Sequence, residues 1–121
     1  MQQRALAAFC LVAIVAIGPS AHAHAFMERA APAVGSTVHG SPQAIRIWFT
    51  QELEPAFSTL KLLDAKGNVL VAGDRAVDPS DRTLLRVVLP PLAPGTYRVV
   101  WRVLSIDSHV TEGDFTFDVV P

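Results

Sequence analysis

Two stretches of this 121-residue chain, residues 97–103 and 113–119, alternate apolar and polar side chains, with Val100 as the one break in the first. In the first stretch, tyrosine, valine and tryptophan occupy odd positions, with Arg98 and Arg102 between them. Side chains of a β-strand repeat every two residues, so each stretch predicts a strand with one face on a core and the other in water. This pattern excludes an amphipathic helix at either place.

The rest of the chain carries shorter apolar runs separated by turns rich in proline, glycine, asparagine and aspartate. These runs cover residues 25–30, 45–49, 60–64, 69–71 and 83–89. No window keeps a helical period of 3.6 residues. We therefore predict an all-β fold, a seven-stranded antiparallel Greek-key β-sandwich of the Ig-like or cupredoxin-like kind.

Most aromatic residues fall on the predicted inward faces of these strands. Their regular alternation favours core packing over ligand binding. Trp48 is the exception, because it lies on the opposite face from Ile47, and we expect it to cover the outside of the sandwich or to flank a site. The inward aromatic residues are Phe49, Tyr97, Trp101, Phe115 and Phe117.

The first residues have the pattern of a secretory signal peptide. A positive charge at Arg4 precedes an apolar run over residues 5–17, which is shorter than the about 20 residues that span a membrane. Small residues then precede His24 at the positions that signal peptidase requires. We expect cleavage after Ala23, which divides the chain into a signal peptide, 1–23, and a mature domain, 24–121.

This cleavage would make His24 the first residue of the mature protein. Its α-amine and imidazole could then close one chelate ring around a metal ion, which an internal histidine cannot do because its nitrogen is an amide. Cleavage after Ala21 is an alternative, and would give His22-Ala23-His24, which binds metal through amide nitrogens. In a third interpretation these histidines only belong to the signal region.

The composition of the mature part limits its chemistry. Cys10 is the only cysteine and lies in the signal run, so neither a disulfide nor a thiolate metal site is expected. Without Arg4, nine of the 10 Lys and Arg residues remain beside 11 Asp and Glu. A net charge of about −2 argues against nucleic-acid binding. No later run reaches spanning length, so we expect a soluble exported protein.

Asp107 and His109 lie between the two clearest strands. In an extended segment they would project to the same side, although a solvated turn is the ordinary interpretation of such a pair. Together with His24 they would offer an amine, two imidazoles and a carboxylate, a donor set that suits tetragonal copper(II). His39 lies in a turn region and is predicted to be a surface residue.

A known pattern covers nearly the whole mature length of the chain. Its segments are His24 and residues 31–36, 47–50, 54–58, 94–103, 105–109, 113 and 115–117. In these segments the chain resembles the CopC family of periplasmic copper-resistance proteins. The resemblance implies that His24, Asp107 and His109 bind copper(II), one ion per chain, in the periplasm. It also implies handover of the ion to an inner-membrane copper transporter.

The chain departs from the family pattern in ways that bear on the metal. Met27 is the only methionine of the mature part, so no copper(I) site is expected. Many members have Phe-Ser-Glu where this chain has Phe-Thr-Gln, which leaves the outer-shell role open among Gln51, Glu52 and Glu54. The proline that usually follows the second histidine is Val110 here, a change in loop stiffness more than in chemistry.

The favoured function is a copper(II) carrier or buffer in copper homeostasis and resistance, and not an enzyme. A copper-dependent oxidase with a histidine-brace site is one alternative. Asp107 would then occupy a position that oxygen needs, and so small a domain has little room for a flat substrate surface. A metal-free β-sandwich that serves as an interaction module is the other alternative, since fold does not give function.

Overall fold

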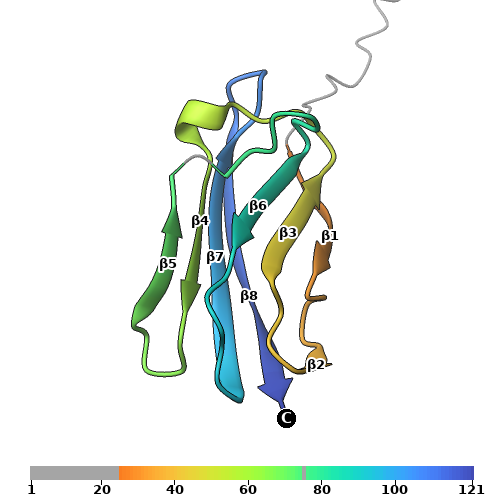
Figure 1. Cartoon of the computed structure of the whole chain (residues 1–121). Helices are drawn as coiled ribbons and strands as arrows, with labels where there is room; N and C mark the ends of the chain where they lie inside the picture. The colour runs from red at the N-terminus through yellow and green to blue at the C-terminus, as the bar shows by residue number, and fades with distance from the viewer. Residues whose placement is uncertain (1–24, 75) are drawn as a thin grey trace, which may run out of the picture.

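The computed structural model describes residues 25–74 and 76–121, which form two facing β-sheets (Figure 1). One sheet has three strands in the order β1-β3-β6, and the other has five in the order β2-β8-β7-β4-β5. The elements are β1 (Met27–Ala31), β2 (Thr37–His39), β3 (Ala44–Phe49), the 3-10 turn η1 (Pro55–Phe57), β4 (Thr59–Leu63), β5 (Val69–Gly73), β6 (Leu84–Val88), β7 (Gly95–Leu104) and β8 (Val110–Val120).

The expected two-sheet β-sandwich is confirmed, with eight strands in the described residues where seven were expected. The additional strand is β2, which pairs with β8 in parallel, whereas every other ladder is antiparallel. The backbone N–H of Gly35 donates to the carbonyl of Thr116 at 2.8 Å, and that of Gly40 to Val120 at 2.9 Å. These bonds hold the segment that leaves β1 along the edge of β8.

The core lies between the sheets and confirms the inward aromatic residues. The ring of Phe49 meets that of Trp101 edge-on, with centroids 5.1 Å apart, and Tyr97 stacks on Phe117 at 5.8 Å. All five expected aromatic residues, Phe115 among them, are at most 8% exposed. Burial of this apolar area is the main term that stabilises the sandwich.

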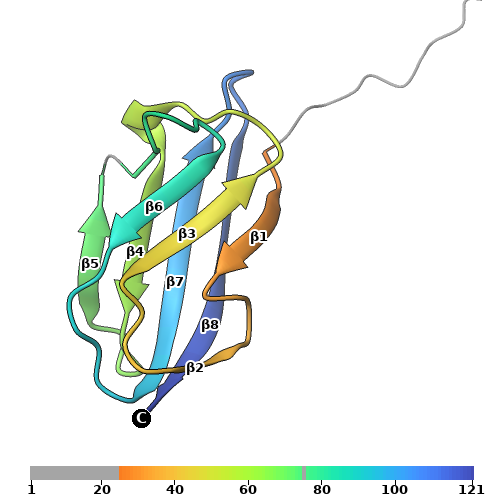
Figure 2. The same ribbon diagram turned by 45° about the vertical axis from the view of Figure 1, so that its right-hand side comes forward.

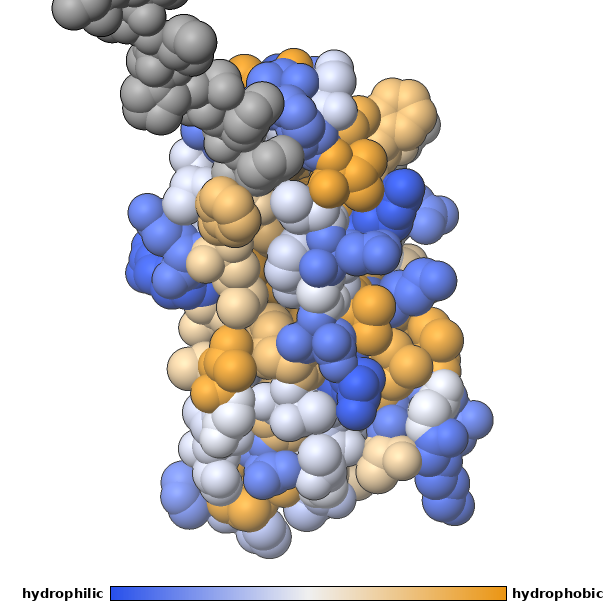
Figure 3. Space-filling model, turned by 180° about the vertical axis from the view of Figure 1, so that it is seen from behind, coloured by the Kyte–Doolittle hydropathy of each residue, from blue (hydrophilic) through white to orange (hydrophobic). Residues whose placement is uncertain are grey.

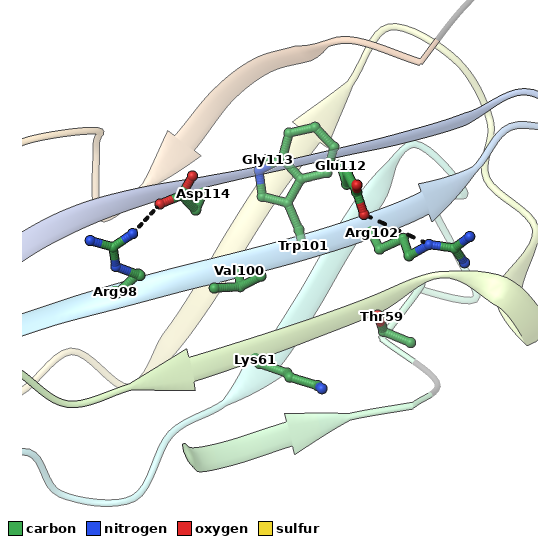
Figure 4. A pocket seen from close by; sticks show the side chains of 9 residues that line it. All are labelled: Thr59, Lys61, Arg98, Val100, Trp101, Arg102, Glu112, Gly113 and Asp114. Carbon is green, nitrogen blue, oxygen red and sulfur yellow. Dashed lines mark hydrogen bonds and ion pairs between the residues drawn. The ribbon is translucent and has the colours of Figure 1, made fainter. Parts of the chain in front are cut away.

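Gly113 makes room for the indole of Trp101, its partner in the β7–β8 register. A Cβ built on Gly113 would lie 2.6 Å from Cζ2 of that ring. Figure 4 shows the indole reaching across to β8 at this position. The glycine is therefore required by the close approach of the ring, which a larger residue would displace.

One end of the sandwich gathers the segments that matter for a metal site. The first residues of β1 and the connection from β7 to β8 both lie at the end opposite the C-terminus (Figure 2). The loop between β3 and η1 closes the same end, since the Glu54 N–H donates to the Leu104 carbonyl at 2.8 Å. Within the residues described, no helix is long and apolar enough to cross a bilayer.

Candidate metal site

The connection between β7 and β8, residues 105–109, is a tight turn and not an extended segment. The Ser105 N–H donates to the His109 carbonyl at 3.0 Å, and the Ser108 N–H donates to the Ser105 carbonyl at 2.9 Å. Ser108 closes the turn with φ at 71°, a left-handed conformation that few non-glycine residues adopt. The turn that is the ordinary interpretation of such a pair is therefore what the chain forms, because it must reverse within five residues.

The turn nevertheless brings the two predicted donors together. Oδ1 of Asp107 lies 3.3 Å from Nδ1 of His109; the side chains are 34% and 40% exposed, while the Nδ1 atom itself is buried. The Ser105 hydroxyl donates to Oδ1, and this bond is the main reason that the pKa of Asp107 lies below its ordinary value, with the His109 imidazole contributing next. Asp107 is therefore a carboxylate at neutral pH.

Ser105 is the residue that sequence reasoning missed. It is fully buried, and its hydroxyl also accepts from the His109 N–H at 3.3 Å. Its backbone forms an isolated bridge with Leu53, which ties the turn to the neighbouring loop. The sequence offered no signal for this role beyond a serine two residues before the aspartate, because the bonds depend on the turn.

The segment that follows His24 is fixed beside this turn. Ala25 is fully buried, and its carbonyl accepts from the Thr111 hydroxyl at 2.8 Å. The Phe26 N–H donates to the Thr50 hydroxyl at 3.0 Å, and the Thr50 N–H donates back to the Phe26 carbonyl at 2.9 Å. His24 and the expected signal peptide lie outside the described residues.

The anchor at Ala25 joins the start of the described chain to the strand that follows the turn. Thr111, which holds the Ala25 carbonyl, is only two residues after His109. The segment that begins at Ala25 therefore lies against the first residues of β8.

The donor pair fits a metal ion but does not complete a site. Two ligands at right angles, each about 2.0 Å from one ion, lie about 2.8 Å apart, so the 3.3 Å between Asp107 and His109 needs only a small adjustment. Among residues 25–74 and 76–121, no three His, Cys, Asp or Glu side chains gather to hold an ion. In the site expected from the sequence, His24 would add donors from outside the described residues.

The candidate outer-shell residues lie in the loop that contacts the turn. The Ile106 N–H donates to the Glu52 carbonyl at 3.1 Å, so Gln51, Glu52 and Glu54 run alongside the connection. In the described part of the chain, none of the carboxylates of this loop forms a three-donor group with Asp107 and His109. Their outer-shell role stays a prediction.

Two other residues singled out from the sequence lie away from the turn. His39 is exposed and pairs with Val120 at the opposite end of β8, about 30 Å or more from His109 for a strand of 11 residues. Its Nδ1 lies 3.3 Å from the Pro121 carbonyl. Met27 is partly buried against the core, on the first residue of β1.

The surface also carries a hollow of about 560 Å³ on the outer face of the five-stranded sheet (Figure 4). Neither Asp107 nor His109 lines it, and its walls hold three cations, Lys61, Arg98 and Arg102, beside two acids, Glu112 and Asp114. Both acids already contact an arginine, so the hollow is a poor place for a metal ion. The turn, which lies outside this hollow, is the better candidate.

The family model described as the CopC domain matches residues 27–120. Protein YobA of Escherichia coli strain K12 is 35% identical over 104 residues, 85% of this chain and 84% of that protein. Copper resistance protein C of Escherichia coli is 30% identical over 113 residues, 88% and 89% of the two chains. The crystal structure of CopC from Methylosinus trichosporium OB3b has a TM-score of 0.76 and 36% identity, covering 81% of this chain and 95% of that one.

Proposed function

Because the chain belongs to the CopC family, we propose that it binds copper(II) in the periplasm and carries or buffers the ion in copper homeostasis and resistance. One ion per chain would be held by His24, Asp107 and His109. The single observation that carries this proposal is the anchor of Ala25 on Thr111, since it tethers the residue after His24 beside the turn that presents the other two donors.

The donor chemistry favours copper(II) among divalent ions. An amine and two imidazoles with one carboxylate oxygen suit a tetragonal ion, and copper(II) has the highest affinity in the first-row series. Asp107 adds a negative charge that partly balances the ion, because its lowered pKa keeps it ionised. With Met27 as the only methionine outside the expected signal peptide, a thioether site for copper(I) has no second methionine to use.

Binding, rather than catalysis, agrees with the names of the relatives, which include copper resistance proteins. In this proposal a carboxylate, an amine and two imidazoles fill the plane around the ion, which leaves little room for a substrate there. The recipient would be an inner-membrane copper transporter, reached after export through the signal peptide. Release to such a partner is easier from a turn that is partly exposed than from a buried site.

The proposed site is tested by comparing a protein that begins at His24 with one that carries a single extra residue before it. The added residue converts the amine into an amide, so copper(II) affinity should fall by orders of magnitude and the EPR spectrum should lose one amine nitrogen. His109→Ala should weaken binding more than Asp107→Ala, because water replaces a carboxylate oxygen more readily than an imidazole. Measurements are competition titration and EPR.

The alternatives give different results in the same experiment. Equal affinity and identical spectra for the two forms would contradict the N-terminal chelate. Failure of the protein that begins at His24 to bind equimolar copper would leave the metal-free interaction module. A protein beginning at His22 would give a spectrum with more nitrogen ligands, from backbone amides.

Copper affinity should also fall in acid, and the cause can be assigned. Nitrogen donors must lose protons to coordinate, and free amines and imidazoles protonate near and below neutral pH. The pKa of Asp107 is lowered, so its carboxylate stays charged until the pH is well below that range. Loss of copper affinity between about pH 7 and 5 would therefore result from protonation of the nitrogen donors. An affinity that stays flat over this range would contradict a nitrogen-rich site.

A further inference from the structure

The outer face of the three-stranded sheet carries three arginines, one from each strand. Arg29 on β1, Arg46 on β3 and Arg86 on β6 are all exposed. The register pairs Arg29 with Trp48, and Arg46 directly with Arg86. The fold therefore places these cations side by side on one flat surface, away from the turn with Asp107.

The pairing of Arg46 with Arg86 is unfavourable for folding. Like charges at directly opposed positions of an antiparallel pair destabilise a sheet. In the described part of the chain neither arginine forms an ion pair. Arg29 has a different partner, because its guanidinium carbon lies 3.8 Å from the centroid of the Trp48 ring. The three guanidinium groups thus keep donors available for an external acceptor.

Two carboxylates lie near this face, and neither neutralises it. Glu28 is the extra residue of the bulge in β1 and is exposed, and it forms no ion pair with the described residues. Oδ1 of Asp78 accepts from the hydroxyl and the N–H of Ser80, at 2.6 and 2.8 Å. Arg86 acts on Asp78 only through a longer-range attraction. The cations therefore exceed the acids on this surface.

The other sheet shows that this arrangement is not a general property of the fold. On its outer face, Arg98 contacts Asp114 at 2.6 Å, and Arg102 lies 3.8 Å from Glu112 (Figure 4). Each of these arginines faces a carboxylate of the neighbouring strand. Figure 3, seen from this side, shows hydrophilic side chains along the middle of the face.

We propose that the face formed by Arg29, Arg46 and Arg86 is a docking surface for an acidic segment of a protein partner. Guanidinium groups bind carboxylates through paired hydrogen bonds, and a guanidinium stacked on an indole keeps its N–H edge free for them. The chain as a whole has a net charge of −1, so the cationic face would orient an acidic partner and set where it contacts the protein.

An acidic protein segment fits this face better than a membrane does. Three cations on a chain of negative overall charge attract an anionic bilayer only weakly, and salt screens that attraction. Val88, two residues after Arg86 on β6, is exposed, and so short an apolar side chain offers little insertion into lipid. A strand-like acidic segment lying on a flat sheet would meet all three guanidinium groups. This surface does not depend on the proposed copper site.

The test uses a fluorescently labelled peptide of consecutive glutamates as the probe, with binding followed by anisotropy at low salt. The Arg46→Gln/Arg86→Gln double variant should lose affinity by about tenfold or more, as expected when two charged contacts are removed. The Arg98→Gln/Arg102→Gln double variant is the matched control, since it changes net charge equally on the other sheet. Its affinity should stay within about twofold of the parent.

Three results would overturn the proposal. The first is that the parent protein does not bind the peptide at all. The second is an equal loss of affinity in the two double variants, which would indicate net charge alone. The third is binding of vesicles rich in phosphatidylglycerol that the peptide does not displace, which would assign the face to a membrane. Thermal unfolding of both variants shows whether each remains folded, and since all four arginines are exposed, a folded control is expected.

Discussion

The two sheets of the sandwich share one core but treat their outer faces differently. On the five-stranded sheet, Arg98 and Arg102 each face an acid across the ladder. On the three-stranded sheet, Arg46 faces Arg86. Because the inner faces of both sheets are buried in one core, folding of that core does not choose the charges outside. The difference teaches that strand register decides which charged side chains lie opposite one another. Where two like charges lie opposite one another at a cost in stability, a role in binding is the first explanation to test.

The largest effect should come from the tight packing of the five-stranded sheet. Gly113→Ala would bring a methyl group to 2.6 Å from the indole of Trp101, and the ring, wedged edge-on against Phe49, has little room to move. We expect a loss of roughly 1–3 kcal/mol in the free energy of unfolding, as for other overpacked cores. Urea denaturation measures it.

Gly95→Ala is the control for this change. Gly95 lies in the same ladder, and its nearest neighbour to an added Cβ is 4.0 Å away. The free energy of unfolding of the Gly95→Ala protein should change little or rise slightly, because alanine restricts the conformations of the unfolded chain. Equal losses at both positions would mean that the effect comes from removing a glycine and not from the indole.

Reversing the charge of one arginine should change the free energy of unfolding by a smaller amount, and in opposite directions on the outer faces of the two sheets. Arg46→Glu places a carboxylate opposite Arg86 and should stabilise the protein by roughly 0.2–1 kcal/mol. Arg98→Glu places a carboxylate beside Asp114 and should destabilise it by a similar amount, about 0.2–1 kcal/mol. Denaturation at low and high salt measures both. A stability change of the same sign in both variants would contradict the contrast between the faces.

The smallest expected effect is a change in the pKa of Asp78, an acid beside the three-stranded sheet. The pKa of Asp78 is lowered mainly by the Ser80 hydroxyl and in small part by Arg86. A carboxyl group with a lowered pKa adds stability above its ordinary pKa, and this stability is lost as the pH falls through the folded value. Arg86→Gln should raise the pKa of Asp78 slightly, and Ser80→Ala should raise it more. NMR titration of the Asp78 carboxyl group tests this order.

The parts of the fold that the sequence predicted are those where periodicity is strong. β7 and β8 alternate over many residues, so their inward faces could be assigned from pattern alone. β2 could not be predicted in this way, because three residues are too few to show a period. Its parallel pairing also depends on hydrogen bonds from Gly35 and Gly40 to β8, which is distant in the sequence.

The same distinction applies to the candidate site. Asp107 and His109 were recognised from a short motif, and the structure brings them together, although through a turn. Ser105 and Thr111 could not be recognised, because each acts through a bond that exists only once the end of the sandwich is assembled. His24 stays a prediction.

The two bonds between Phe26 and Thr50, with the Thr111 bond to Ala25, have a kinetic consequence. They make the segment before β1 a small unit that can open without unfolding the sandwich, and the amide protons of Phe26 and Thr50 would exchange with solvent when it does. An ion that bound residue 24 together with the turn would favour the closed form and slow that exchange. Hydrogen exchange at these two amides would then follow metal occupancy without any spectroscopic signal from the metal.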